Sequence, residues 1–285
     1  NLRQLADSPG DRISIQDLRK SGRMTARERI HALLDSDSFV EIDAFVQHRS
    51  GDHNLHLHRP LGDGVVAGHG MLDGRRIVCF AQDYSIFEGT MGEMHAKKIA
   101  KVARFAEKSQ LPIIGIWDGD GQRAYEGVPA LGATGELLDI LVACSGRIPI
   151  ISLVLGTVSG VSALAAGLSD FVILGSEHGQ MFMRSPYFIP EVISGEIDEQ
   201  TLGGAESHAS RSGVACLVAD DEHDAINIAA EILGYLPDHT LAESFNVNSG
   251  DPWDRRCKKL EKIVPSDSNK PYDMLEVIRE VVDEQ

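Results

Sequence analysis

A glycine-bearing turn near the middle of the chain could stabilise a negatively charged oxygen. The turn Gly156–Gly160 follows the apolar run Ile150–Leu155, which is typical of a strand buried on both faces, and a helix rich in small residues is expected from about Ser162. The first backbone N–H groups of such a helix have no partners within it, and the helix dipole favours negative charge beside them. An oxygen that gains charge during thioester chemistry would be held in this way. An ordinary βα unit packed with alanines is the alternative interpretation.

A second turn with polar residues and glycines lies upstream. The run Pro112–Trp117 predicts another buried strand, the turn Asp118–Arg123 follows it, and a helix is expected at about Gly132–Cys144. Two consecutive βα units imply a right-handed parallel arrangement with both turns on one rim of the sheet. This rim is where α/β domains usually bind their ligands.

Several segments, taken together, resemble the biotin-dependent acyl-CoA carboxyltransferases, and the β chains of propionyl-CoA and acetyl-CoA carboxylases in particular. The segments that carry the resemblance are residues 87–102, 118–128, 156–171 and 202–215, and residues 21–43, 62–76 and 269–284 match as well. The resemblance covers nearly the whole chain in order. It implies an α/β, crotonase-like fold, the ββα superhelix of these enzymes.

The resemblance also assigns candidate site residues. It implies that the backbone N–H groups of Gly160 and Val161 hold the thioester oxygen, where the family usually has two adjacent glycines. Carboxyl transfer from carboxybiotin and decarboxylation of a malonyl-type thioester both pass through an enolate and need such donors. Further candidates are Gly121 and Gln122 beside the catalytic turn, and Gly89, Thr90, Asp118, Asp120, Arg123, Ser159 and His208 around the substrate.

The turn Asp118–Arg123 departs from the family pattern, which usually reads Asp-Ser-Gly-Gly-Ala-Arg. Asp118 and Arg123 match it, but several residues between them differ. Asp120 places a carboxylate where the family has a glycine, and this group would repel a substrate carboxylate unless it is protonated or paired. These departures count against the usual propionyl-CoA or acetyl-CoA substrate.

A helix expected at Glu93–Lys108 carries the densest basic cluster in the chain. Ile99, Val102 and either Phe105 or Ala106 recur at helical spacing and should face the core. We expect the cations mostly on the other side, where they are candidates for binding coenzyme A phosphates; a solvated helix face is the alternative. These cations are Lys97, Lys98, Lys101 and Arg104.

Composition limits the remaining classes of function. The formal net charge of −16 argues against non-specific binding to nucleic acid or to an anionic membrane surface, and no apolar stretch is long enough to cross a membrane. The four cysteines form no CxxC pair, which favours a reducing cytoplasm and predicts no zinc ribbon. The histidine-rich segment 53–58 could bind a metal if it were a strand, but a surface loop is favoured, so no metal is predicted.

Three parts are expected along the chain. Residues 1–20 are polar and should form an N-terminal arm; the chain starts without Met, so we expect a trimmed terminus and no signal peptide. Residues 21–238 should form the crotonase-like acyl-CoA carboxyltransferase domain. Residues 239–285 should form a linker and a terminal amphipathic helix at Tyr272–Glu284.

The resemblance implies an incomplete catalytic unit. In the carboxyltransferase β chains, a segment like residues 269–278 lies between two homologous halves, of which the first holds acyl-CoA and the second supplies the carboxybiotin pocket. We therefore expect biotin to act only through a partner chain. The expected partners are a second copy or a second carboxyltransferase-like chain, with biotin carboxylase and biotin carrier subunits also possible.

Three functions follow as hypotheses. The first is a carboxyltransferase subunit that stabilises the enolate of an acyl-CoA. The second is a biotin-independent decarboxylase of malonyl- or methylmalonyl-type thioesters, which would use the same oxyanion site in a homo-oligomer. The third is a non-catalytic scaffold that keeps the fold in order to dock partners.

Overall fold

The computed structural model describes residues 2–10, 12–185, 198–243, 250, 252 and 254–282. The chain forms two compact units, Asn1–Glu243 and Ser244–Gln285. The division lies a few residues beyond the boundary expected after residue 238.

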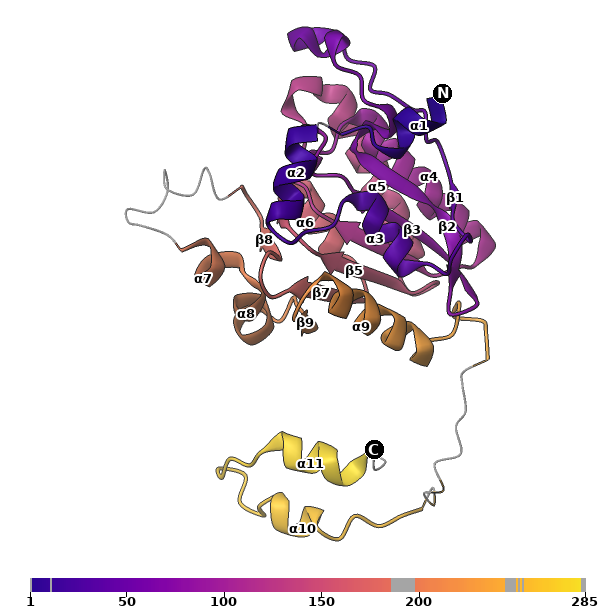
Figure 1. Ribbon diagram of the computed structural model, residues 1–285. Coiled ribbons are helices and arrows are strands. Elements are labelled where there is room, and N and C mark those ends of the chain that lie inside the picture. Colours follow the sequence, from indigo (N-terminus) through magenta and orange to yellow (C-terminus); the bar gives the residue numbers. More distant parts are fainter. Residues whose placement is uncertain are drawn as a thin grey trace. The chain divides into compact units, whose positions relative to one another are not determined.

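A seven-stranded sheet is the centre of the first unit (Figure 1). Its strands lie in the order β1-β2-β3-β4-β5-β7-β9, with antiparallel pairs from β1 to β3 and parallel pairs from β3 onward. A second, two-stranded parallel sheet joins β6 to β8. The strands are β1 (Val40–Glu41), β2 (Val65–Leu72), β3 (Arg75–Gln82), β4 (Ile113–Trp117), β5 (Ile150–Val154), β6 (Thr157–Ser159), β7 (Phe171–Gly175), β8 (Gln180–Phe182) and β9 (Leu217–Ala219).

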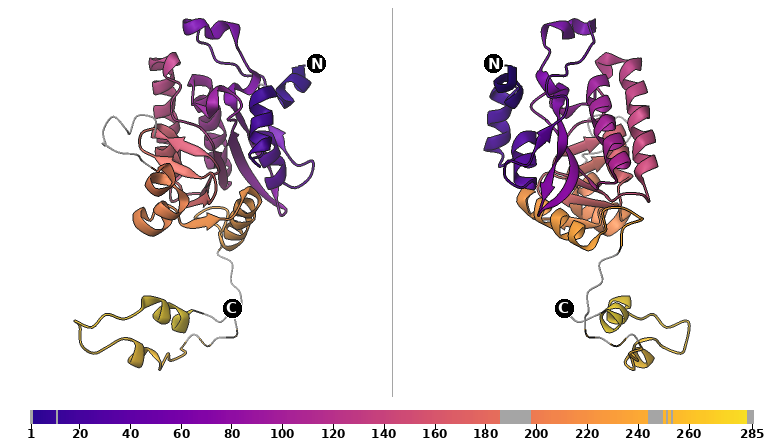
Figure 2. Two further views of the ribbon diagram at one scale, coloured as in Figure 1. Left: turned by 60° about the vertical axis from the view of Figure 1, so that its left-hand side comes forward. Right: turned by 90° about the vertical axis from the view of Figure 1, so that its right-hand side faces the viewer.

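Helices cover both faces of the large sheet, as Figure 2 shows. Side chains of α4, α5 and α6 form the core on one face, and those of α3 and α9 form the core on the other. The helices of this unit are α1 (Leu2–Asp7), α2 (Arg12–Lys20), α3 (Ala26–Leu33), α4 (Glu93–Ser109), α5 (Val128–Cys144), α6 (Gly160–Gly167), α7 (Glu199–Gly203), α8 (Ala205–Ser207) and α9 (Glu222–Tyr235).

The two central βα units have the expected arrangement. Strands β4 and β5 are fully buried and pair in parallel, with Trp117 opposite Val154 at their carboxyl ends. The turns that follow both strands therefore emerge at the same edge of the sheet. Strands β2 and β3 are joined by a hairpin at Asp73–Gly74, and both residues have positive φ, as a tight two-residue hairpin turn requires.

Side-chain caps fix the starts of two helices, and both use spacings that can be recognised in the sequence. Thr25 caps α3, and the Thr25 and Glu28 side chains each bond to the other's backbone N–H, which forms a capping box. Asp221 caps α9 by accepting a hydrogen bond from the Asp224 N–H.

Other boundaries differ from the sequence expectations. The helix after the turn Gly156–Gly160 begins at Gly160 instead of Ser162, because residues 157–159 extend as a strand beside β8. Helix α5 begins at Val128, one turn before Gly132, since Pro129 is tolerated in a first helical turn. The segment 38–45 contributes only the two residues of β1 to the sheet.

Two further segments can be compared with the sequence expectations. The N-terminal segment forms helices α1 and α2 instead of an irregular arm, and Ala6 and Leu18 are buried within the first unit. The histidine-rich segment is mostly exposed and forms 3₁₀ turns at Asp52–Leu57 and no strand, in agreement with the favoured surface loop.

The second unit contains α10 (Leu260–Ile263) and α11 (Met274–Val281). Asp273 caps α11, and neither helix has a buried residue. Among the described residues, we find no helix with the length and apolar character needed to span a bilayer. The segment Pro186–Pro190, expected to form a site wall or an interface, lies outside the described residues.

Candidate functional site

Three loops meet at the carboxyl ends of the central strands. They are loop A (residues 87–92), loop B (118–123) and loop C (156–161), which follow β3, β4 and β5 in the chain. Loops A and B are joined by backbone hydrogen bonds in both directions. The Met91 N–H donates to the Gly121 carbonyl at 2.8 Å, and the Arg123 N–H donates to the Met91 carbonyl at 2.9 Å. The fold therefore brings together loops A and B, which lie about thirty residues apart in the sequence.

Glycines allow the three loops to approach closely. A Cβ at Gly89 would lie 2.1 Å from the Asp118 carbonyl oxygen, and one at Gly119 would lie 2.1 Å from the Gly89 carbonyl oxygen. Gly121 has a φ of +75°, and a Cβ there would lie 3.0 Å from the Ser159 hydroxyl of loop C. Loops B and C are thus in direct contact at Gly121 and Ser159, two of the predicted site residues.

The N-terminus of α6 opens at this junction. Ser159 is the N-cap residue, and its extended backbone turns into the helix at Gly160, where φ is +53°. Such a φ is unfavourable for residues with a Cβ. The N–H groups of Gly160 and Val161 belong to the first turn, which has no preceding helical carbonyls to accept them. Together with the helix dipole they form a site suited to an oxygen that gains negative charge.

Asp118 is a buried member of this junction. Its side chain is only 1% exposed, and its Oδ2 accepts hydrogen bonds from Arg23 at 2.5 Å and Arg29 at 2.6 Å. The Asp118 backbone N–H donates to the Gln82 side chain at 3.0 Å. The sequence indicated the position of Asp118 but not the arginines that hold it.

Asp120 lies at the edge of the same junction. Its N–H donates to the Glu88 carbonyl at 3.4 Å, and its Oδ2 accepts a hydrogen bond from the Ser185 hydroxyl at 3.0 Å. Its Oδ1 is buried and has no hydrogen-bond partner among the described residues. Asp120 therefore adds a second carboxylate, beside that of Asp118, to the junction of the three loops.

Arg123 clamps loops A and B and does not open to solvent. Its side chain is 2% exposed and donates to Asp63 at 2.6 Å, to Glu126 at 2.8 Å and to the Thr90 carbonyl at 2.9 Å. The guanidinium also stacks 4.4 Å from the centre of the Phe87 ring. In this conformation Arg123 contacts protein groups, and its expected contact with substrate stays a prediction.

A buried polar chain behind loop B had no signal in the sequence. The His95 Nδ1 lies 3.1 Å from the Asp63 carbonyl, its Nε2 lies 3.3 Å from the Gln82 amide nitrogen, and Gln82 in turn accepts the Asp118 N–H. Burial, with the nearby Arg123 charge, holds the pKa of His95 well below its usual value. A neutral His95 can accept from Gln82 while donating to Asp63, which orients the amide toward loop B.

The expected basic cluster on α4 is dispersed into separate contacts. Lys98 was expected on the solvent side but is fully buried, and its ammonium donates to the Val65 carbonyl at 2.7 Å. The expectation was therefore wrong for Lys98, which faces the edge of the sheet near β1 and β2. The other cations each pair with a carboxylate: Lys97 with Glu93, Lys101 with Asp43, and Arg104 with Glu136. The binding of coenzyme A phosphates by these exposed cations of α4 stays a prediction.

The remaining predicted side chains make local contacts. The imidazole of His208 bonds to the Met181 carbonyl at 2.9 Å and to the Ser212 hydroxyl at 2.8 Å, which anchors the turn after α8. Thr90 donates to the Phe87 carbonyl at 2.6 Å within loop A. Gln122 is half-buried and pairs with Met91 in the bridge between loops A and B.

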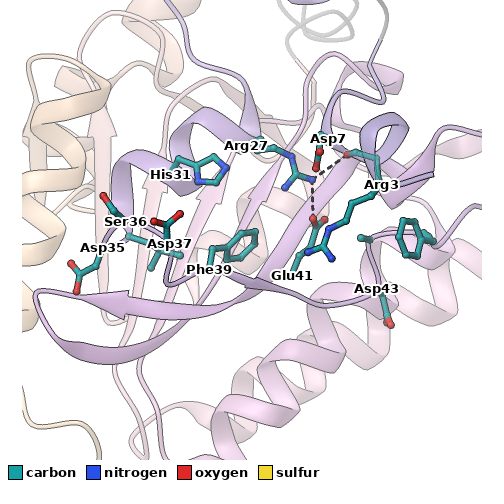
Figure 3. Close-up of a pocket in the computed structure, with 14 residues that line it drawn as sticks. Arg3, Asp7, Arg27, His31, Asp35, Ser36, Asp37, Phe39, Glu41 and Asp43 are labelled. Carbon is teal, nitrogen blue, oxygen red and sulfur yellow. Dashed lines mark hydrogen bonds and ion pairs between the residues drawn. The ribbon is translucent and has the colours of Figure 1, made fainter. Parts of the chain in front are cut away.

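A separate cavity of about 750 Å³ lies between α1, α3 and β1 (Figure 3). Arg27 crosses it to bind Glu41 at 2.8 Å, and none of its fourteen lining residues belongs to loops A, B or C. In the described part of the chain, no three His, Cys, Asp or Glu side chains are grouped so as to hold a metal ion.

Comparison with known proteins decides the family. The carboxyl transferase domain family matches residues 17–285. The chain belongs to this family. It is 40% identical over 279 residues to the biotin-dependent acetyl-/propionyl-coenzyme A carboxylase beta5 subunit of Mycobacterium tuberculosis, covering 95% of this chain and 51% of that protein. It is also 40% identical over 274 residues to the methylmalonyl-CoA decarboxylase subunit alpha of Veillonella parvula, covering 96% and 54%.

Solved structures show the same fold. The structure of transcarboxylase 12S with hydrolysed methylmalonyl-coenzyme A bound has a TM-score of 0.88 at 32% identity, covering 99% of this chain and 55% of that one. A chain of a Pseudomonas malonate decarboxylase hetero-tetramer in complex with malonate has a TM-score of 0.67 at 25% identity, covering 90% and 95%. The predicted crotonase-like carboxyltransferase fold and family resemblance are confirmed. The chain spans about half the length of the curated relatives it matches.

Proposed function

We propose that this carboxyl transferase family member binds an acyl-CoA thioester and stabilises its enolate during carboxyl transfer. The observation that carries this proposal is the N-terminus of α6, where Gly160 has a φ of +53° at the junction of three loops. The backbone N–H groups of Gly160 and Val161 are the donors for the thioester oxygen.

The chemistry assigned to the chain is electrostatic. Loss of a proton from the α-carbon of the acyl group moves charge to the thioester oxygen, and the two N–H groups stabilise that charge more strongly than the neutral carbonyl. Carboxybiotin, carried by a partner chain, would supply the carboxyl group that the α-carbon accepts, and the ureido nitrogen that gives up this carboxyl group would take up the α-proton. The chain thus acts as a carboxyltransferase subunit that requires a second copy, or a second carboxyltransferase-like chain, for the biotin pocket.

Decarboxylation is the second candidate, and two kinds of similar protein support it. Methylmalonyl-CoA decarboxylase alpha subunits are as similar to this chain as carboxylase subunits, and the matched malonate decarboxylase chain is of comparable length. In this reaction the bond between the α-carbon and the carboxylate breaks, CO₂ leaves, and the enolate at the same site accepts a proton. The scaffold hypothesis has no structural observation in its favour.

The cellular setting is part of the proposal. Cys79 and Cys144 are buried free thiols, and burial raises their pKa values to about 12 and about 11. Inert buried thiols suit a reducing cytoplasm, where we place this protein. Biotin carboxylase and biotin carrier subunits are the further partners that carboxyl transfer would need.

The first experiment is to incubate the purified chain with malonyl-CoA, methylmalonyl-CoA and ethylmalonyl-CoA and to follow the products by mass spectrometry. Loss of CO₂ would identify a self-sufficient decarboxylase. Intact thioesters that still raise the unfolding temperature would support a carboxyltransferase subunit. If no thioester, propionyl-CoA included, binds the chain, the proposed function is wrong and the scaffold hypothesis replaces it.

A further inference from the structure

We propose that Arg29 is a positioning residue for the oxyanion site, acting through Asp118 and held in place by Glu222. The inference rests on the proposed function, which it deepens. Arg29 belongs to α3 and Glu222 is the first residue of α9, so both lie on the opposite face of the sheet from α6.

Arg29 bridges two carboxylates that are far apart in the sequence. Its Nη1 donates to Asp118 Oδ2 at 2.6 Å, while its Nε and Nη2 donate to the two oxygens of Glu222 at 3.0 and 2.5 Å. The Arg29 side chain is 1% exposed. A planar guanidinium can make this forked contact and a third bond at once, whereas a lysine ammonium cannot.

A second guanidinium group lies in the same cluster. Arg23 also donates to Asp118 Oδ2, at 2.5 Å, so two guanidinium groups face the two carboxylates of Asp118 and Glu222. The Met24 N–H donates to Glu222 as well, at 3.1 Å. Removing Arg29 leaves both carboxylates in a buried environment with fewer donors, so they must move or take up water.

Movement of Asp118 is transmitted directly to the site. A Cβ on Gly156 would lie 1.9 Å from Asp118 Oδ1, so the carboxylate rests against loop C at the start of the turn that leads to Gly160. The Asp118 carbonyl packs against Gly89 of loop A in the same way. Asp118 is therefore in contact with all three loops, and its position sets the distance between loop B and the α6 N-terminus.

Small displacements at this point have large effects on the stabilisation of charge. Oxyanion donors act at hydrogen-bond distance, and a misplacement of about 1 Å can cost on the order of a hundredfold in rate. We expect binding of the rest of coenzyme A, which lies away from the thioester oxygen, to be independent of this distance. A positioning role for Arg29 therefore predicts a selective loss: the enolate state is bound more weakly, while the ground state is bound as before.

The test measures this selectivity without turnover. A coenzyme A derivative that ends in a nitronate mimics the enolate charge, and a dethia ketone analogue of the same length mimics the neutral substrate. Calorimetry gives the two dissociation constants for the wild-type chain and for Arg29→Met, Glu222→Gln and Arg27→Met. Arg27→Met is the matched control, since Arg27 lies on the same helix and binds Glu41 instead of the Asp118 cluster.

In Arg29→Met we expect the preference for the nitronate over the ketone to fall by about tenfold or more, in line with displaced donors. Glu222→Gln should lower this preference less. Arg27→Met should keep the wild-type preference, although the unfolding temperature of this variant falls. Unchanged preference in both Arg29→Met and Glu222→Gln overturns the inference. If Arg29→Met does not fold, Glu222→Gln decides alone. A wild-type chain that binds neither analogue contradicts the proposed function instead.

Discussion

Gly160 combines two roles that depend on different properties of the residue. Its N–H is a proposed donor, and its φ of +53° sets the direction of the first turn of α6. A Cβ at this position would meet only the Met183 carbonyl oxygen, at 4.0 Å. Space is therefore available, and the backbone conformation is the feature that disfavours other residues.

Gly160→Ala should keep the N–H and add only backbone strain. We expect the free energy of unfolding to fall by about 1–2 kcal/mol, the usual cost of a left-handed residue with a Cβ. Gly167→Ala is the control, because Gly167 ends the same helix without a positive φ and with open space around its Cα. That change should be neutral or stabilising by about 0.5–1 kcal/mol. Equal stability of the two variants in urea unfolding would contradict the role of φ at Gly160.

Val161 keeps its N–H but adds a branched side chain that packs against the main core. Val161→Gly should enlarge the acyl pocket and raise the affinity for longer acyl-CoA chains, relative to propionyl-CoA, by roughly tenfold, the value of about one methylene group in a pocket. Titration calorimetry with a series of acyl-CoA lengths measures this ratio. Val142→Gly, at an exposed helical position on α5, controls for the loss of helix propensity. A length profile equal to that of the wild-type chain would mean that Val161 does not line the pocket.

At the scale of elements, the short edge strand β1 is held by charges from neighbouring helices. Glu41 in β1 accepts from Arg27 of α3 at 2.8 Å and lies 3.7 Å from the Lys98 ammonium of α4. Burial lowers the pKa of Lys98 from 10.5 to about 8, although Glu41 and Asp43 oppose the shift. The contact that fixes β1 therefore includes a cation that is costly to bury.

This pKa determines how Lys98 affects stability with pH. The folded-state pKa lies below the unfolded-state value, so between pH 8 and 10.5 the unfolded chain binds more protons. The contribution of Lys98 to stability therefore rises with pH across this window, and below it the full cost of burying the charge is present. We expect the free energy of unfolding of the wild-type chain, relative to Lys98→Met, to rise by about 2–3 kcal/mol from pH 7 to pH 10.5.

Urea unfolding at several pH values measures this difference, and Lys97→Met on the exposed side of the same helix is the control. The control should differ from the wild-type chain by an amount that hardly changes with pH. A constant difference for Lys98→Met as well would show that Lys98 is hydrated in the folded protein.

At the scale of the molecule, the stability of the first unit is self-contained. Both hydrophobic cores consist of residues before Glu243, and no residue of α10 or α11 is buried. Each face of the large sheet is already covered by helices of the same unit. The first unit therefore contains all the residues of both cores.

A fragment of residues 1–243 should unfold within a few degrees of the full chain in calorimetry, because it retains both cores. It should also bind acyl-CoA thioesters with unchanged affinity, since loops A, B and C lie within it. A large drop in unfolding temperature would contradict the prediction that residues 1–243 are sufficient for the stability of the first unit.

Short-range patterns determined much of this protein from the sequence alone. Buried runs bounded by glycines identified β4 and β5 and placed their turns on one edge, and the Thr25–Glu28 capping box located the start of α3. These features depend on residues a few positions apart, so they can be recognised in the sequence. The same patterns carried the family resemblance and drew attention to Gly160.

Contacts between distant segments were decided only by the tertiary structure. Arg29 meets Asp118 across 89 positions and Glu222 across 193, and no periodicity signals such pairs. Lys98 was expected in solvent because helical spacing defines the faces of a helix but not which neighbours cover them. Burial and charge pairing depend on the packing of α3, α4 and α9 on the sheet, and this packing converts separate motifs into one site.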